Sequence, residues 1–268
     1  MKLGVCTSAS ANAAILAGSD AAFAEENVQG FLKPRDADES AWQQRLADAR
    51  ACGRPILAAN CFLPGDLPCV GPAVDRAAIR AWAETAFRRA SEAGIVRIVF
   101  GSGGSRRIPD GFDRARARAQ FVDLLRELGP MAHARGVCLV VEPLNSGECN
   151  FITSVDEGAA IVRDAGVDGV RLLADIYHML RDGEGPESIV RAGALLRHVH
   201  VAEREKRTAP GVAGDDFGSY LRALARIGYS DAISIESGWQ DFAAQLPGAM
   251  AELRRQVDAA FACAAAAR

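Results

Sequence analysis

The chain has 268 residues, of which 49% are hydrophobic and 24% are charged, a balance typical of a globular protein with a large buried core. Its formal net charge of −3 excludes the strongly basic surface that binds nucleic acid or anionic membranes, so small-molecule chemistry is expected. Seven cysteines without CxxC spacing indicate reduced, mostly buried thiols in the cytosol and not a disulfide framework.

The first 24 residues loosely imitate a signal peptide, because Lys2 precedes an alanine-rich stretch. Polar residues such as Ser10 and Asp20 interrupt any apolar core, so we do not interpret this segment as a leader. No window of the sequence approaches a membrane span. We therefore expect a cytoplasmic protein with neither nucleic acid nor a membrane as its partner.

Short apolar runs alternate with longer helical patterns, and no low-complexity linker divides the chain. Helical spacing of apolar residues predicts helices over 75–93, 114–134, 155–165 and 217–227. The predicted strands, in chain order, are 2–8, 21–28, 55–62, 95–102, 137–143, 170–176, 197–203 and 232–238.

Glycine repeatedly closes a helical pattern just before a strand, as at Gly94, Gly136 and Gly228. Such glycines are typical of helix C-termini and support repeated βα units. Eight βα units match the length of a barrel of about 250 residues, and each strand run is apolar enough to be covered by helices. The predicted fold class is therefore α/β, a single-domain (β/α)8 TIM barrel over residues 1–268; a doubly wound sheet would usually need fewer strands.

Residue types that commonly bind metals lie near the ends of four successive predicted strands. Glu142, Asp175, His200 and Glu236 each lie near the end of a different predicted strand. Side chains alternate along a strand, and active sites of these barrels lie at the C-terminal mouth, so inward-facing ligands can converge on one ion. Three carboxylates with one imidazole suit a divalent metal, Mn²⁺ first, with Mg²⁺, Co²⁺ or Zn²⁺ as alternatives, whereas thiolates would have favoured structural zinc.

Nearby polar residues have simpler interpretations. His198 faces the same way as His200, and we expect it to lie below that ring as a supporting donor and not to ligate. Glu25, at the end of its strand, either lines the pocket or is exposed to solvent. His133, at a predicted helix end, is expected at the surface or as a cap.

Two loops carry weaker signals. The glycine-rich segment 101–104 with Arg106 and Arg107 could cradle a phosphate or sugar oxygens, although a flexible turn fits equally well. Trp239 could stack on a sugar face or simply pack within its loop.

The strand-end residues and their neighbours resemble the sugar phosphate isomerase/epimerase superfamily of xylose-isomerase-like barrels, and within it the ketose 3-epimerases of the tagatose/psicose type. In that family a Glu, an Asp, a His and a Glu at the ends of the last four strands hold the metal, and the four residues above match them in order. Family members also carry a second Glu, a His after the Asp and an Arg after the metal His, which implies substrate-binding roles for Glu148, His178 and Arg207.

The resemblance implies an isomerase or epimerase of a keto sugar or related polyol derivative that works through an enediolate. A metal that binds the C2 and C3 oxygens polarises the carbonyl, and Glu142 and Glu236 could then exchange protons on opposite faces. His178 and Arg207 could bind the oxygen that becomes anionic, while Glu148 orients a hydroxyl or a neighbouring ligand.

Of three alternatives, the first stays open, and the sequence argues against the other two. The same ion and base could expel a β-hydroxyl, giving a dehydratase or lyase that acts on a keto-inositol or a 3-keto-glycoside. A nuclease of the endonuclease IV kind would need a multi-zinc cluster with more than the four histidines present and a basic face for DNA. A sugar-binding barrel without catalytic activity would lack some of the four metal ligands, whereas this sequence has all four. Assembly as a homo-oligomer is open as well.

Overall fold

The structure is a computed structural model that describes residues 1–266. Eight parallel strands close into a barrel in which each pairs with its sequence neighbours and the last pairs with the first. The predicted (β/α)8 barrel is confirmed, and every predicted strand is present in shortened form. The strands are β1 (Lys2–Cys6), β2 (Ala24–Asn27), β3 (Ile56–Asn60), β4 (Arg97–Phe100), β5 (Cys138–Val141), β6 (Val170–Asp175), β7 (Leu196–Val201) and β8 (Ala232–Ile235).

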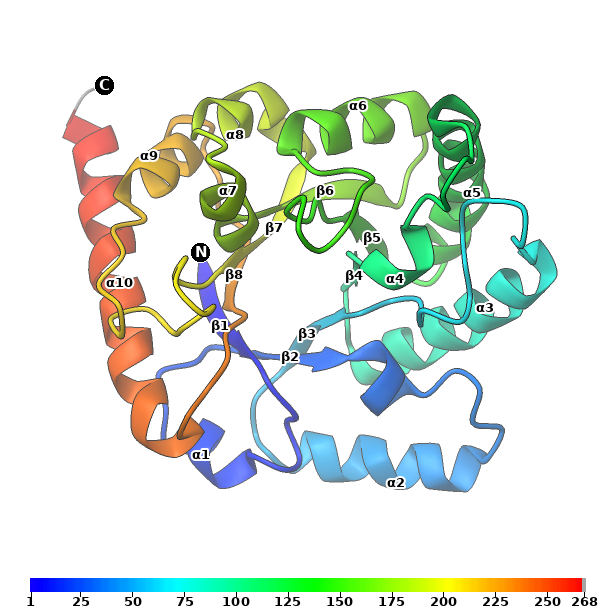
Figure 1. Ribbon diagram of the computed structural model, residues 1–268. Coiled ribbons are helices and arrows are strands. Elements are labelled where there is room, and N and C mark those ends of the chain that lie inside the picture. The colour runs from blue at the N-terminus through cyan, green and yellow to red at the C-terminus, as the bar shows by residue number, and fades with distance from the viewer. Residues whose placement is uncertain (267–268) are drawn as a thin grey trace.

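Helices surround the barrel, with the strands at the centre of the view in Figure 1. The long ones are α2 (Glu39–Arg50), α3 (Arg76–Ala93), α5 (Arg114–His133), α6 (Val155–Ala165), α9 (Gly218–Arg226) and α10 (Phe242–Ala266). Shorter elements are α1 (Ala13–Ala17), the π-helical turn η1 (Val28–Leu32), α4 (Gly103–Arg106), α7 (Ile176–Asp182), α8 (Glu187–Ala192) and the 3₁₀ turn η2 (Gly193–Leu195).

The four predicted helices are confirmed within two residues as α3, α5, α6 and α9. The helices α3, α5 and α6 each begin at a capping side chain. The caps are Asp75, Asp113 and Ser154, which accept from the backbone N–H three residues ahead at 2.9, 2.8 and 3.1 Å. Two long helices, α2 and α10, were not predicted. Only three residues of α2 are buried, and α10 is rich in alanine with Pro247 inside it.

Side chains alternate along the barrel strands between the interior and the helical layer. Val99, Val140 and Leu173 are fully buried and form a separate cluster inside the barrel. The next inward positions on β5 and β6 are two residues further on, at the C-terminal mouth. The strand register places Asp175 beside His200, so polar side chains replace the apolar layer where the strands end.

No helix among the described residues is long and apolar enough to cross a membrane. The seven cysteines are free, and Cys61 and Cys263 are exposed. The expectation of mostly buried thiols is therefore wrong for these two.

Candidate metal centre

Four side chains from successive strands converge at the C-terminal mouth. Glu142, Asp175, His200 and Glu236 each offer one ligand atom, and these four atoms all lie within 4.8 Å of one another. Atoms bound to one ion at about 2.0 to 2.4 Å stand no further apart than about 4.8 Å. The predicted residues are therefore brought together at a spacing that a single divalent ion can bridge.

The imidazole of His200 presents a different nitrogen to each side. Its Nδ1 lies 3.2 Å from Oε1 of Glu142 and 3.3 Å from Oε2 of Glu236. Its Nε2 lies 2.9 Å from Oε1 of Glu25. Nδ1 is thus the nitrogen that faces the carboxylate cluster, while Nε2 faces away from it.

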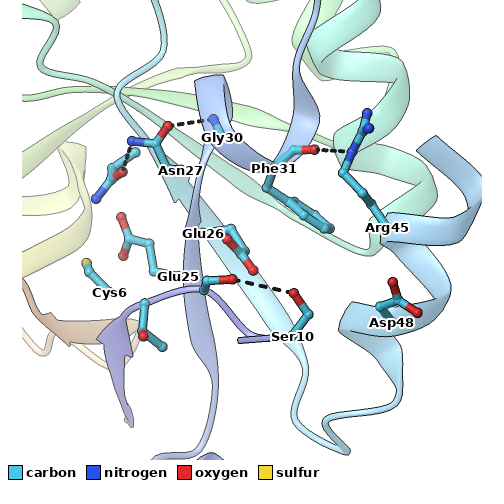
Figure 2. Close-up of a pocket in the computed structure, with 12 residues that line it drawn as sticks. Cys6, Ser10, Glu25, Glu26, Asn27, Gly30, Phe31, Arg45 and Asp48 are labelled. Carbon is cyan, nitrogen blue, oxygen red and sulfur yellow. Dashed lines mark hydrogen bonds between the residues drawn. The ribbon is translucent and has the colours of Figure 1, made fainter. Parts of the chain in front are cut away.

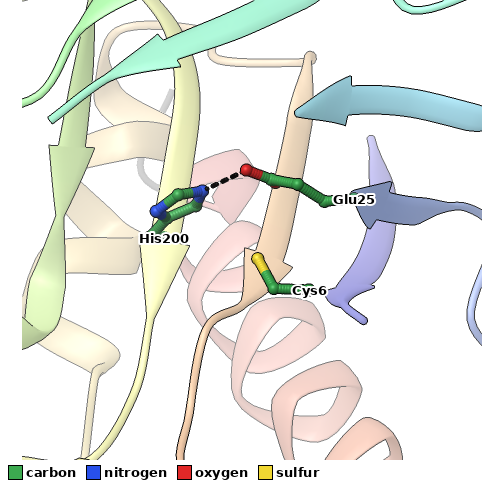
Figure 3. Close-up of side chains that lie close together, drawn as sticks. All are labelled: Cys6, Glu25 and His200. Atoms are coloured by element: carbon green, nitrogen blue, oxygen red, sulfur yellow. Dashed lines mark hydrogen bonds and ion pairs between the residues drawn. The ribbon is translucent and has the colours of Figure 1, made fainter. Parts of the chain in front are cut away.

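Glu25, on β2, is buried and contacts both strand histidines. Figure 3 shows its contact with His200. Its second oxygen, Oε2, lies 2.7 Å from Nε2 of His198 and accepts from Oγ of Ser234 at 2.6 Å. Burial raises the pKa of Glu25, but the charges and hydrogen bonds of the two histidines outweigh it and hold the pKa well below its usual value. Glu25 is therefore an anion that orients the ring of His200, a common arrangement behind metal-bound imidazoles.

The structure corrects one expectation here and supports another. Glu25 is 1% exposed, so the solvent-exposed interpretation is wrong. His198 lies below His200 and bonds to Glu25, outside the group of four converging ligand atoms.

Cys6, at the end of β1, also has its sulfur near Glu25 and His200 (Figure 3). Burial raises the pKa of the Cys6 thiol well above its usual value, with Glu25 adding to the effect, and a protonated thiol is a poor ligand. Both oxygens of Glu25 already accept hydrogen bonds. The group of four is therefore the better candidate for a metal site.

Glu142 follows β5 directly and depends on Gly101, the residue after β4. A Cβ on Gly101 would overlap Oε2 of Glu142, so only glycine leaves room for this carboxylate. Glu142 is 5% exposed, and burial raises its pKa above the usual value.

Glu236 follows β8 and is held by two side chains. Its Oε1 accepts from Nδ2 of Asn60 at 3.0 Å, and its Oε2 forms an ion pair with Nη2 of Arg207. Burial would raise the pKa of Glu236, but the charges of His200 and Arg207 outweigh it and lower the pKa to about 2. Two neighbouring glutamates therefore have opposite pKa shifts.

Arg207 lies at the barrel mouth, where its position was predicted. Its Nη2 is 3.4 Å from Oδ2 of Asp175, and its Cζ lies 4.6 Å from the centre of the Tyr177 ring. Its backbone φ of 54° is left-handed, which is uncommon for a residue other than glycine and turns the chain sharply after β7.

His178 lies in the first turn of α7, which Asp175 caps by accepting from the Tyr177 N–H at 2.8 Å. Nδ1 of His178 is 3.9 Å from Oε1 of Glu148, and Arg207 Nη1 is 3.8 Å from the same oxygen. The three residues predicted to bind substrate are therefore close together beside the carboxylate cluster.

A cavity of about 280 Å³ lies over these groups. Its lining includes Asn60, Gly103, Gly104, Glu142, Glu148, His178, Arg207 and Glu236. A larger cavity of about 440 Å³ shares Asn60 with it, lies against β1 and β2, and is lined by residues that include Cys6, Glu25 and Asp48 (Figure 2). The smaller cavity is lined by Glu142 and Glu236, two of the four converging residues, so it is the better candidate for chemistry.

In the loop after β4, the interpretation that Arg106 helps to cradle a phosphate or sugar oxygens is wrong. Arg106 is fully buried and donates to the carbonyl oxygens of Phe100 and Ile152 at 3.1 and 3.3 Å. Arg107 donates to the carbonyl of Glu148 at 2.6 Å. Both guanidinium groups thus hydrogen-bond to loop backbone, and Arg107 stays exposed.

Two minor interpretations fit the structure. The Trp239 ring packs edge-on against Phe242 with centroids 5.0 Å apart, as the loop-packing interpretation expects. His133 is exposed at the end of α5.

Sequence reasoning missed two residues that shape the site, Asn60 and Asn145, and it gave Gly101 no role beside Glu142. Asn60 ends β3, and its place at a strand end could have revealed it by the argument used for the ligands. Gly101 and Asn145 lie in loops, and only side-chain geometry shows what they contact.

The chain resembles known proteins along most of its length. The family described as xylose isomerase-like TIM barrel matches residues 13–259. An L-ribulose 3-epimerase of Mesorhizobium japonicum is 29% identical over 215 residues, which cover 77% of this chain and 69% of that protein. A D-psicose 3-epimerase of Agrobacterium fabrum is 30% identical over 125 residues, which cover 46% of this chain and 43% of that protein.

A solved structure of an L-ribulose 3-epimerase has the same fold. Its TM-score is 0.82 at 21% identity, and the match covers 99% of this chain and 97% of that one. The fold therefore extends over the whole of both chains.

Proposed function

Because the chain belongs to the xylose isomerase-like TIM barrel family, we propose that it is a divalent-metal-dependent epimerase or isomerase of a keto sugar or a related polyol derivative. The observation that carries the proposal is the convergence of four ligand atoms within 4.8 Å at the barrel mouth. The relatives named L-ribulose 3-epimerase and D-psicose 3-epimerase support a keto sugar as the substrate.

The donor set fits a hard divalent cation. Oxygens of Glu142, Asp175 and Glu236 with Nδ1 of His200 would hold it, and such a set favours Mn²⁺ over soft metals, with Mg²⁺, Co²⁺ and Zn²⁺ as alternatives. When bound, the ion would polarise the carbonyl and hydroxyl oxygens of the substrate and stabilise the negative charge of an enediolate.

Glu142 and Glu236 are assigned the proton transfers. They extend from β5 and β8, which are separated by two strands in the barrel, and they approach Nδ1 of His200 at 3.2 and 3.3 Å. Each can use one oxygen as a ligand and the other to exchange a proton, so the two carboxylates can serve opposite faces of the substrate.

Three residues are assigned to substrate binding. Arg207 and His178 offer N–H donors to the oxygen that becomes anionic, and Glu148 accepts from a substrate hydroxyl. All three line the smaller cavity together with both glutamates. Assembly as a homo-oligomer and a cytoplasmic location stay predictions.

Turnover of keto sugars in D₂O tests the proposal. The Mn²⁺-loaded protein should convert L-ribulose or D-psicose to an isomer with one carbon-bound solvent deuterium, on the carbon that lost its proton for an epimerase and on the former carbonyl carbon for an isomerase. Loss of water from the substrate would instead support the dehydratase or lyase alternative. If neither deuterium incorporation nor product appears with any of the four metals, the proposed function is wrong.

A further inference from the structure

The orientation of one buried amide is fixed by its neighbours. Oδ1 of Asn145 accepts from the backbone N–H groups of Gly147 and Glu148 at 3.1 and 3.2 Å. A reversed amide would place its NH₂ group against these two donors. Nδ2 of Asn145 must therefore face the other way.

On that other side, Nδ2 of Asn145 meets two acceptors. It donates to Oε1 of Glu148 at 2.8 Å and lies 2.8 Å from Nδ1 of His178. Since the amide nitrogen can only donate, Nδ1 of His178 must accept, and a neutral imidazole then carries its proton on Nε2. Asn145 and His178 are both 4% exposed, so water does not compete for this contact.

Nε2 of His178 is a buried atom without a hydrogen-bond partner. It lies 3.4 Å from Oδ2 of Asp175, and the residue lines the cavity over the carboxylate cluster. A buried N–H group without a partner is uncommon in folded proteins and indicates an acceptor that arrives with a ligand.

We infer that Asn145 is a positioning residue that holds His178 in the Nε2–H form, so that the ring donates to a substrate oxygen at the metal centre. This inference rests on the proposed function and deepens it. With its only lone pair directed at Asn145, the ring cannot remove a proton from the substrate. His178 therefore stabilises charge, and proton transfer is left to the glutamates.

Nitrogen NMR of the ligand-free protein tests the proton position without any assay of activity. The protein has four histidines, and H178Q identifies the signals of His178 by their loss. We expect a protonated Nε2 and an unprotonated Nδ1 in the wild type. N145D keeps an acceptor for the two backbone N–H groups but has no N–H to donate, so Nδ1 of His178 should become protonated. A proton on Nδ1 in the wild type, or an unchanged ring in N145D, would overturn the inference.

A double-mutant cycle separates positioning from general damage to the loop. With L-ribulose or D-psicose as substrate, N145D should lower kcat by about tenfold or more, the scale of a misplaced transition-state donor, with a smaller change in KM. In the H178Q background the same substitution should have little further effect, because no ring remains to be oriented. Additive losses would overturn the inference.

S146A is the matched control. Ser146 is exposed on the same loop, and its hydroxyl bonds to Asp182 at 3.0 Å, so this variant should keep the kcat and the His178 signals of the wild type. If the wild type converts no keto sugar, the proposed function fails, and the NMR spectra still decide the role of Asn145.

Discussion

Glu25 and His200 are 175 residues apart in the sequence, yet Oε1 of Glu25 lies 2.9 Å from Nε2 of His200 in the barrel interior. Both side chains are almost completely buried. Because Nε2 of His200 contacts Glu25, Nδ1 is the nitrogen that faces the carboxylate cluster. The metal centre therefore depends on a residue of β2 that offers no ligand atom to the group of four.

The first prediction concerns that contact. E25Q removes the anion beneath His200 and places an amide NH₂ against imidazole donors, so the affinity for Mn²⁺ should fall by about 10- to 100-fold. Calorimetric titration of the metal-free protein measures it. E26Q is the matched control, because Glu26 is the adjacent buried carboxylate and bonds to the Ala9 N–H at 2.6 Å. Equal Mn²⁺ affinity in E25Q and E26Q would contradict this role.

The second prediction concerns the two glutamates. E142Q and E236Q should each lower kcat by at least about a thousandfold, since each removes a proton-transfer group. Bound Mn²⁺ should fall less than activity, because the amide oxygen can still ligate. Metal analysis beside steady-state kinetics checks both. Wild-type exchange of the substrate hydrogen in either variant would exclude that residue as the sole base on its face.

The third prediction concerns Arg207 and pH. Arg207 contributes to lowering the pKa of Glu236 to about 2, so R207A should let burial raise that pKa. The ionised form of Glu236 is then lost at a higher pH as the solution is acidified, and the acid limb of the kcat/KM profile should move to higher pH. R204A, an exposed arginine on the same loop, should keep the wild-type profile. An unshifted limb in R207A would show that Arg207 does not act on Glu236.

The fourth prediction concerns Gly101. G101A should displace the Glu142 carboxylate, because the new methyl group would overlap Oε2. Activity should fall by at least about tenfold, along with Mn²⁺ affinity. In G185A the added methyl group meets nothing within 4 Å, so that variant should behave as the wild type. Full activity in G101A would mean that Glu142 does not need its present position.

The sequence was sufficient to predict the barrel and the convergence of the four candidate ligands because both depend on local patterns. Apolar runs marked every strand, and period-two alternation placed Glu142 and Asp175 on the same face as Val140 and Leu173. It was insufficient for contacts between distant strands. The bond from Asn60 to Glu236 spans 176 residues, and no local pattern predicts such a pair.

The same limit explains why the sequence did not reveal the surroundings of Arg106 in the loop after β4. A glycine-rich segment next to two arginines predicts anion binding only if the guanidinium groups are free. Arg106 instead finds its partners on a loop after β5, at the Ile152 carbonyl.

Anomalous diffraction from a crystal soaked in Mn²⁺ tests the central claim most directly. We predict one ion at the barrel mouth with oxygens of Glu142, Asp175 and Glu236 and Nδ1 of His200 at about 2.0 to 2.4 Å. An ion bound instead through Nε2 of His200 with Cys6 and Glu25, or no anomalous peak at the mouth, would contradict the account.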